Sequence, residues 1–207
     1  FVSMMNARAK ELGMTNTHFV NATGLDAEGH ISSAHDVAIM SRELIKHDLI
    51  KNYSTVWMDS LRDGESELVN TNKLVRFYEG TTGLKTGTTS GAGYCLSATA
   101  ERNGLELVAV IMSGDTSNDR FNGAKKLLDY GFANYEYTTI KPQPDVSEIS
   151  IKKGVQKSVK IKVEQDFGSL LKKSNAASIT QQTTLTQNLT APIQKGDVVG
   201  AVEFYLN

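Results

Sequence analysis

The sequence holds one cysteine, one tryptophan and three prolines among its 207 residues. A single cysteine cannot form an intrachain disulfide, so a disulfide-stapled scaffold is excluded. No apolar run approaches the roughly 18 residues that suggest a membrane-spanning helix. An excess of one charge is also absent, since 22 Lys and Arg residues oppose 23 Asp and Glu residues. This balance argues against a nucleic-acid partner, which needs a basic excess on one face.

The four histidines lie in the first quarter of the chain, without the spacing of metal ligands. We therefore expect no metal and no cofactor. The remaining composition is that of an ordinary globular protein, with 40% hydrophobic and 22% charged residues. The length allows one domain or two modest ones.

The first residues predict a helix that already includes residue 1. Phe1, Met4, Met5 and Leu12 recur at helical spacing, and neither an initiator methionine nor a signal-like segment precedes them. Natural domains rarely begin inside an uncapped helix. We therefore expect the chain to be a piece of a longer protein.

Two further helices and a hairpin are expected in the first two thirds of the chain. A capping box at residues 33–36 precedes a helix predicted to run to about Asp48. Ser117 is predicted to cap a helix that runs to about Asn134, with Leu127, Leu128 and Phe132 on its buried side. Between them, residues 93–101 alternate as a strand, Asn103-Gly104 forms a hairpin turn, and residues 105–112 return as an apolar strand.

The composition changes near Pro142 and Pro144, beyond which short alternating segments dominate. These segments predict strands, with at most one helical turn near Ser169. We therefore place a domain boundary here, with a mixed helix-and-strand domain over 1–143 and a small antiparallel β domain over 144–207.

The segment before the predicted hairpin carries the clearest chemical motif, Gly83-Leu84-Lys85-Thr86-Gly87-Thr88-Thr89. Lys-Thr-Gly occurs in penicillin-binding proteins and class A β-lactamases. A strand edge offers backbone groups to an extended substrate, the lysine adds positive charge, and the glycine admits the substrate without a Cβ. As a bare tripeptide the motif is weak, and an ordinary turn before a strand explains it better.

The context of the motif is specific. In chain order, the matching segments are Asn16–Asn21, Gly24-Leu25-Asp26, Ser32–Asp36, the Lys-Thr-Gly segment itself, Ala92-Gly93-Tyr94, Ser113-Gly114, Arg120 with residues 125–128, and Ala191–Gly200. In this order, over nearly the whole chain, they resemble the low-molecular-weight penicillin-binding proteins, which are serine D-alanyl-D-alanine carboxypeptidases.

The resemblance implies an α+β fold. Its first part would belong to a penicillin-binding, transpeptidase-like (β-lactamase-like) α/β domain, and the small antiparallel β domain would follow. It also implies an extracytoplasmic enzyme of the cell envelope that removes the terminal D-alanine from peptidoglycan stem peptides through an acyl-serine. The expected partners are a stem peptide ending in D-Ala-D-Ala and β-lactams.

The resemblance also assigns roles to individual residues. Lys85 would be catalytic, and Thr86 and Gly87 would line the substrate strand. The backbone N–H of Thr88 would contribute to the oxyanion hole. Arg120 would bind the terminal carboxylate of the substrate from further out, as a bidentate guanidinium does.

The family's acylating serine is not recognisable in this chain. No Ser-x-Asn occurs in the 207 residues, and Ser-x-x-Lys occurs twice, at Ser150–Lys153 and Ser169–Lys172. The first match lies on a predicted strand, where positions i and i+3 face opposite sides. The second lies in the β domain, on the wrong side of Lys-Thr-Gly. We expect neither to be catalytic and place the nucleophile in an N-terminal segment, which a separate chain could supply.

The sequence also allows other functions for the chain and other roles for single residues. The chain could be a non-catalytic binding or structural fragment of such a protein. A β-lactamase is disfavoured, because too much chain follows Gly87. Asn70-Thr71-Asn72 fits a cleft-facing amide or an ordinary turn equally well. Cys95 is interpreted as a small, buried apolar residue.

Overall fold

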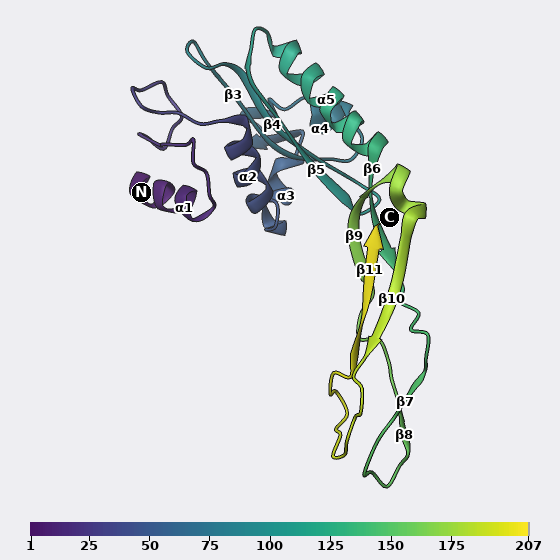
Figure 1. Cartoon of the computed structure of the whole chain (residues 1–207). Helices are drawn as coiled ribbons and strands as arrows, with labels where there is room; N and C mark the ends of the chain where they lie inside the picture. The colour runs from purple at the N-terminus through teal and green to yellow at the C-terminus, as the bar shows by residue number, and fades with distance from the viewer. Residues whose placement is uncertain (207) are drawn as a thin grey trace. The chain divides into compact units, whose positions relative to one another are not determined.

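The computed structural model describes residues 1–206, with the backbone alone at residues 176 and 177. The chain divides into two compact units, Phe1–Ala133 and Asn134–Asn207 (Figure 1).

The first unit combines five helices with two antiparallel sheets. The helices are α1 (Val2–Glu11), α2 (Ala34–Leu44), α3 (Asp48–Ser54), α4 (Leu74–Phe77) and α5 (Ser117–Asn134). The strands are β1 (Met58–Leu61), β2 (Ser66–Val69), β3 (Thr81–Thr89), β4 (Gly93–Arg102) and β5 (Leu105–Gly114). β1 pairs with β2, and the larger sheet has the order β3-β4-β5.

Helices cover both faces of the β3-β4-β5 sheet, with α5 on one side and α2 and α3 on the other (Figure 1). The core lies between α5 and the sheet. It comprises Leu74, Leu96, Ala98, Ala100, Ala109, Phe121, Ala124 and Leu128.

The predicted hairpin is confirmed. Its first strand, β4, is the central strand of the sheet and is buried on both faces. Asn103 and Gly104 have φ values of 51° and 78°, as a type I′ turn requires. On the face of β4 that turns away from α5, the Ser97 hydroxyl lies 2.6 Å from that of Ser41 on α2. Thr99 accepts a hydrogen bond from Thr82 at 2.8 Å. Both hydroxyls of β4 are therefore paired where water is excluded.

Two of the predicted helices differ from the structure in detail. Ser33 caps α2 as predicted, but that helix ends at Leu44, and a separate α3 contacts β3. α5 is capped by Thr116, whose hydroxyl accepts from the Asp119 N–H at 3.2 Å. Leu128 is buried and Phe132 packs against the core, as predicted. Leu127 is 50% exposed, contrary to the prediction, because α5 turns the Leu128 side toward the sheet.

The second unit consists of two-stranded antiparallel ribbons. Its strands are β6 (Tyr135–Ile140), β7 (Glu148–Ser150), β8 (Ser158–Lys160), β9 (Phe167–Lys172), β10 (Ile179–Leu185) and β11 (Gly200–Leu206). The pairs are β6-β9, β7-β8 and β10-β11. Ser169 lies in β9 rather than in a helical turn, and a 3₁₀ helix, Lys173–Ser178, follows that strand.

The second unit begins about ten residues before the predicted boundary at 143/144. β6 pairs along its whole length with β9, from Tyr135 opposite Lys172 to Ile140 opposite Phe167. The prolines at 142 and 144 therefore follow the first strand of this unit, rather than separating two domains. Within the described residues, no helix is long and apolar enough to cross a membrane.

Candidate active site

The Lys-Thr-Gly motif lies in the second half of β3. Within the described residues β3 pairs with β4 alone, so it forms one edge of its sheet. The other side of an edge strand presents backbone N–H and C=O groups that an extended chain can pair with. The motif thus occupies the position from which a strand can bind a peptide.

Lys85 and Gly87 lie on the same face of the sheet. In the register of β3 and β4 they stand opposite Ser97 and Cys95, and Ser97 bonds to α2. The exposed Lys85 ammonium donates to the Thr86 carbonyl oxygen at 2.5 Å. A Cβ on Gly87 would meet nothing within 4 Å, so the surface beside the lysine is open.

Thr86 is buried, with 7% of its surface exposed. Its hydroxyl lies 2.6 Å from the hydroxyl of Thr71. Asn72 is fully buried and donates through Nδ2 to the Gly83 carbonyl at 3.0 Å. The 70–72 segment therefore supports β3 from its α5-facing side, and the amide of Asn72 is used inside the protein.

Arg120 lies deeper than the sequence predicts, with 7% of its surface exposed. Its Nη1 donates to the Gly87 carbonyl at 3.1 Å, to the Thr88 hydroxyl at 3.0 Å and to the Cys95 carbonyl at 3.3 Å. Cys95 has no partner on β5, because the register shifts between Tyr94 and Leu96. The guanidinium thus joins α5 to the end of the Lys-Thr-Gly strand, and its Nε has no hydrogen-bond partner among the described residues.

Cys95 is half-buried, and its thiol contacts the Ala92 carbonyl at 3.4 Å. The two Ser-x-x-Lys matches lie in the second unit, on or beside the strands β7 and β9. Ser169 and Lys172 share β9 and therefore face opposite sides of it. An activated serine needs its base within hydrogen-bond reach, which this geometry does not provide.

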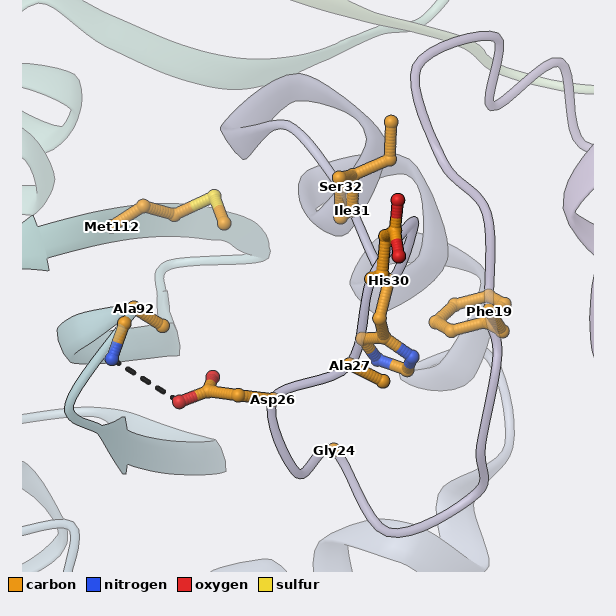
Figure 2. A pocket seen from close by; sticks show the side chains of 11 residues that line it. Phe19, Gly24, Asp26, Ala27, His30, Ile31, Ser32, Ala92 and Met112 are labelled. Carbon is orange, nitrogen blue, oxygen red and sulfur yellow. Dashed lines mark hydrogen bonds between the residues drawn. The ribbon is translucent and has the colours of Figure 1, made fainter.

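The structure adds one residue to which sequence reasoning assigned no role. Asp26 accepts hydrogen bonds from the Thr89 hydroxyl at 2.6 Å and from the Gly91 N–H at 3.2 Å. It lies beside a cavity of about 600 Å³ that Phe19 and His30 also line. In Figure 2, Asp26 points from its loop toward the segment that carries Ala92. In the sequence, only the Gly24-Leu25-Asp26 triplet, one of the segments that carry the family resemblance, pointed to this region.

A buried carboxylate holds the end of the same loop. Asp36 accepts from the Asn16 N–H at 2.8 Å and from the Thr17 hydroxyl at 2.7 Å. Burial by itself would raise the pKa of Asp36, but these hydrogen bonds outweigh it and the pKa lies below its usual value. The folded state therefore favours the ionised form of the Asp36 side chain.

Two family profiles match most of the chain. The D-alanyl-D-alanine carboxypeptidase family profile matches residues 1–116, and that of the C-terminal domain of penicillin-binding protein 5 matches residues 135–207. D-alanyl-D-alanine carboxypeptidase DacF of Bacillus subtilis is 39% identical, over 98% of this chain and 53% of its own length. DacC of Escherichia coli is 35% identical, over 100% of this chain and 52% of its own length. The chain spans about half the length of the curated relatives it matches.

Solved structures give the same relationship. Penicillin-binding protein 5 from Haemophilus influenzae has a TM-score of 0.71 at 32% identity, covering 100% of this chain and 61% of that one. Penicillin-binding protein D2 from Listeria monocytogenes, in a cefotaxime-bound form, has a TM-score of 0.59 at 36% identity. The match covers 63% of this chain and 54% of that one. Sequence and structure together establish that this chain belongs to the D-alanyl-D-alanine carboxypeptidase family of penicillin-binding proteins.

Proposed function

We propose that this chain forms the Lys-Thr-Gly side of the active-site cleft in a penicillin-binding D-alanyl-D-alanine carboxypeptidase. The enzyme would release the terminal D-alanine of peptidoglycan stem peptides through an acyl-serine, in the cell envelope. The observation that carries the proposal is the edge strand β3, which presents Lys85 beside an open Gly87 and is joined to α5 by Arg120. The names of the relatives and the cefotaxime-bound neighbour support both the substrate and the β-lactam ligand.

In this proposal the substrate lies along the free edge of β3. Lys85 places a positive charge near the acylated serine and the substrate carboxylate. Thr86 and Gly87 line the strand, and the Thr88 N–H donates to the oxyanion. Preorganised oxyanion donors act at the charge that develops in the transition state and are worth about 3 kcal/mol each.

Arg120 combines two effects in this proposal. Its Nη1 holds the Gly87 carbonyl and the Thr88 hydroxyl, which fixes the end of the strand. Its positive charge, close beneath Thr88, attracts the terminal carboxylate of a stem peptide. We place the acylating serine outside these 207 residues, because the two local Ser-x-x-Lys matches lack the required geometry.

A labelling experiment with fluorescent penicillin tests the proposal. The 207-residue chain alone is expected to remain unlabelled and inactive on diacetyl-Lys-D-Ala-D-Ala. A hybrid protein, in which the N-terminal segment of the Bacillus subtilis relative precedes Phe1, is expected to be labelled and to release D-alanine. Labelling of the chain alone at Ser150 or Ser169 would overturn the assignment of the nucleophile. A folded but unlabelled hybrid would favour a non-catalytic binding role.

Two substitutions in the hybrid test the roles of the residues. Lys85→Ala is expected to lower acylation and peptide cleavage by about 10²- to 10³-fold, since each tenfold loss corresponds to 1.36 kcal/mol. Lys126→Ala, an exposed lysine on α5, is the matched control. Arg120→Ala is expected to impair cleavage of a free-acid peptide more than that of its amide. Equal losses on both substrates would leave Arg120 with a positioning role alone.

A further inference from the structure

Residues 18–31 form a loop whose two ends lie side by side. His18 and Ile31 exchange backbone hydrogen bonds of 2.9 and 3.1 Å. One residue further out, the hydroxyls of Thr17 and Ser32 lie 2.9 Å apart, and Thr17 also donates to the buried Asp36. Compact loops of this length with closed ends are Ω-loops. The base of the 18–31 loop is therefore fixed to the start of α2.

The interior of the 18–31 loop is tied by its own polar side chains. The Asn21 Oδ1 accepts from the N–H groups of Thr23 at 3.1 Å and Gly24 at 2.8 Å, and its Nδ2 donates to the Leu25 carbonyl at 2.9 Å. The His30 Nδ1 accepts from the Val20 N–H at 3.0 Å. These bonds hold the backbone immediately before Asp26 in one conformation.

At its tip the loop contacts the turn that follows β3 through one carboxylate. Asp26 Oδ1 accepts from the Thr89 hydroxyl and Oδ2 from the Gly91 N–H, and the Thr89 oxygen in turn accepts from the Ala92 N–H at 3.0 Å. A Cβ on Gly91 would lie 3.2 to 3.3 Å from the carboxylate atoms of Asp26. A glycine at this position therefore lets the carboxylate approach the turn closely.

We propose that Asp26 is a positioning residue for the Lys-Thr-Gly strand, an inference that rests on the proposed function. Thr89 directly follows Thr88, whose N–H is the proposed oxyanion donor. In the part of the chain that the structure describes, β3 pairs with a single strand, so its far end is held by β4, by Arg120 and by the Asp26 contact. Asp26 makes two bonds to the turn from a loop anchored at α2, and it restricts the movement of that end.

The first test uses the 207-residue chain and measures amide hydrogen exchange. Asp26→Ala removes both acceptor oxygens, so the bonds from Thr89 and Gly91 are lost together. The Gly91 N–H is expected to exchange about tenfold faster, as the loss of its hydrogen bond implies. Glu28→Ala removes an exposed carboxylate from the same loop and is expected to leave this exchange unchanged. Unchanged exchange in Asp26→Ala would overturn the inference.

The second test measures acylation kinetics in the hybrid protein. Asp26→Ala and Thr89→Val are expected to lower the acylation rate constant by about 10- to 100-fold, with initial penicillin binding unaffected, because a small misplacement acts on the chemical step. Thr89→Ser keeps the hydroxyl and is expected to restore the rate. A merely structural role would lower the melting temperature without changing the rate constant of the folded protein.

The outcomes separate the two proposals. If the unsubstituted hybrid is acylated and Asp26→Ala is acylated equally fast, the positioning role is wrong and the proposed function stands. If the unsubstituted hybrid takes up no penicillin, the proposed function fails, and a catalytic consequence of Asp26 fails with it. The exchange measurement then still shows whether the Asp26 contact holds the turn.

Discussion

The two units use the same antiparallel hairpins but bury different amounts of side chain. In the first, β4 is enclosed between α5 and α2, and Ala98, Thr99 and Ala100 have no exposed surface. In the second, no described side chain is buried. Its ribbons surround a cavity of about 1280 Å³, and its main aromatic contact is the stack of Phe167 on Phe204 at 4.5 Å. Alternation produces strands in both units, but a closed core needs a second layer facing the sheet.

The proposed site residues all lie in the unit that has the closed core. Lys85, Thr86 and Arg120 are held by neighbours that pack against the enclosed sheet of the first unit. Groups that must keep their positions during a reaction are best placed on rigid, buried elements. The second unit offers half-buried strands and no comparable cluster among its described side chains.

The largest expected effect concerns the start of the second unit. A fragment of residues 134–207 is expected to unfold cooperatively, whereas a fragment of residues 144–207 is expected to lack a transition. The reason is that the shorter fragment removes β6, with which β9 pairs along its length. Thermal unfolding followed by circular dichroism measures both fragments. Equal transitions would restore the boundary that the prolines suggested.

A pair of leucine truncations compares the two units directly. Leu96→Ala, in the buried core, is expected to lower the free energy of unfolding by about 3 kcal/mol. Leu171→Ala, half-buried on β9, is expected to cost about 1 kcal/mol, since less apolar surface is removed from the interior. Leu127→Ala, at an exposed position, serves as the control and should change stability by less than about 0.5 kcal/mol. Urea unfolding measures all three, and similar losses for Leu96 and Leu171 would remove the contrast.

The support of β3 by the 70–72 segment predicts a slightly smaller effect. Asn72→Ala removes the bond to the Gly83 carbonyl and the bond from the Leu74 N–H. We expect a loss of about 2 kcal/mol, because the groups left behind are buried. In the second unit, Lys152→Ala removes an exposed bond to Asn188 and is expected to cost less than about 1 kcal/mol. Urea unfolding again measures the difference, and equal costs would argue against a supporting role for Asn72.

The smallest effect is expected at high pH, and in the first unit. Burial, with a hydrogen bond of 2.7 Å to Asp129, raises the pKa of Tyr78 to about 12 from its ordinary value of 10.0. The folded state thus favours the neutral phenol. The resulting contribution to the free energy of unfolding is fully present below pH 10 and is lost as the pH rises toward 12. Between pH 10 and 12, Tyr78→Phe should lose less stability with rising pH than the unsubstituted chain. At pH 7 the substitution should lower the free energy of unfolding by less than about 1 kcal/mol. Unfolding measured from pH 8 to 11.5 would contradict this if the two proteins lost stability in parallel.

Several features followed from the sequence because they depend on neighbours in the chain. The Ser33 cap, the Asn103-Gly104 turn and the alternation of residues 93–101 are local, and the structure contains all three. Lys-Thr-Gly was placed correctly before the hairpin for the same reason. The ends of helices and the Thr116 cap were less predictable, since several nearby side chains compete for the same N–H groups.

The remaining features depend on residues far apart in the sequence. Periodicity grouped Ser97 and Thr99 on one face of a strand, but their burial depends on α2 and on β3, which supply the hydroxyl partners. The Arg120 guanidinium bonds to residues 25 to 33 positions away, and Asp26 to Thr89 across 63 positions. Such contacts leave no local pattern, because each needs only one suitable polar group at each end. Composition and spacing therefore determined the strands, the turns and the motif, while the packing of helices on both faces of one sheet decided which polar groups meet.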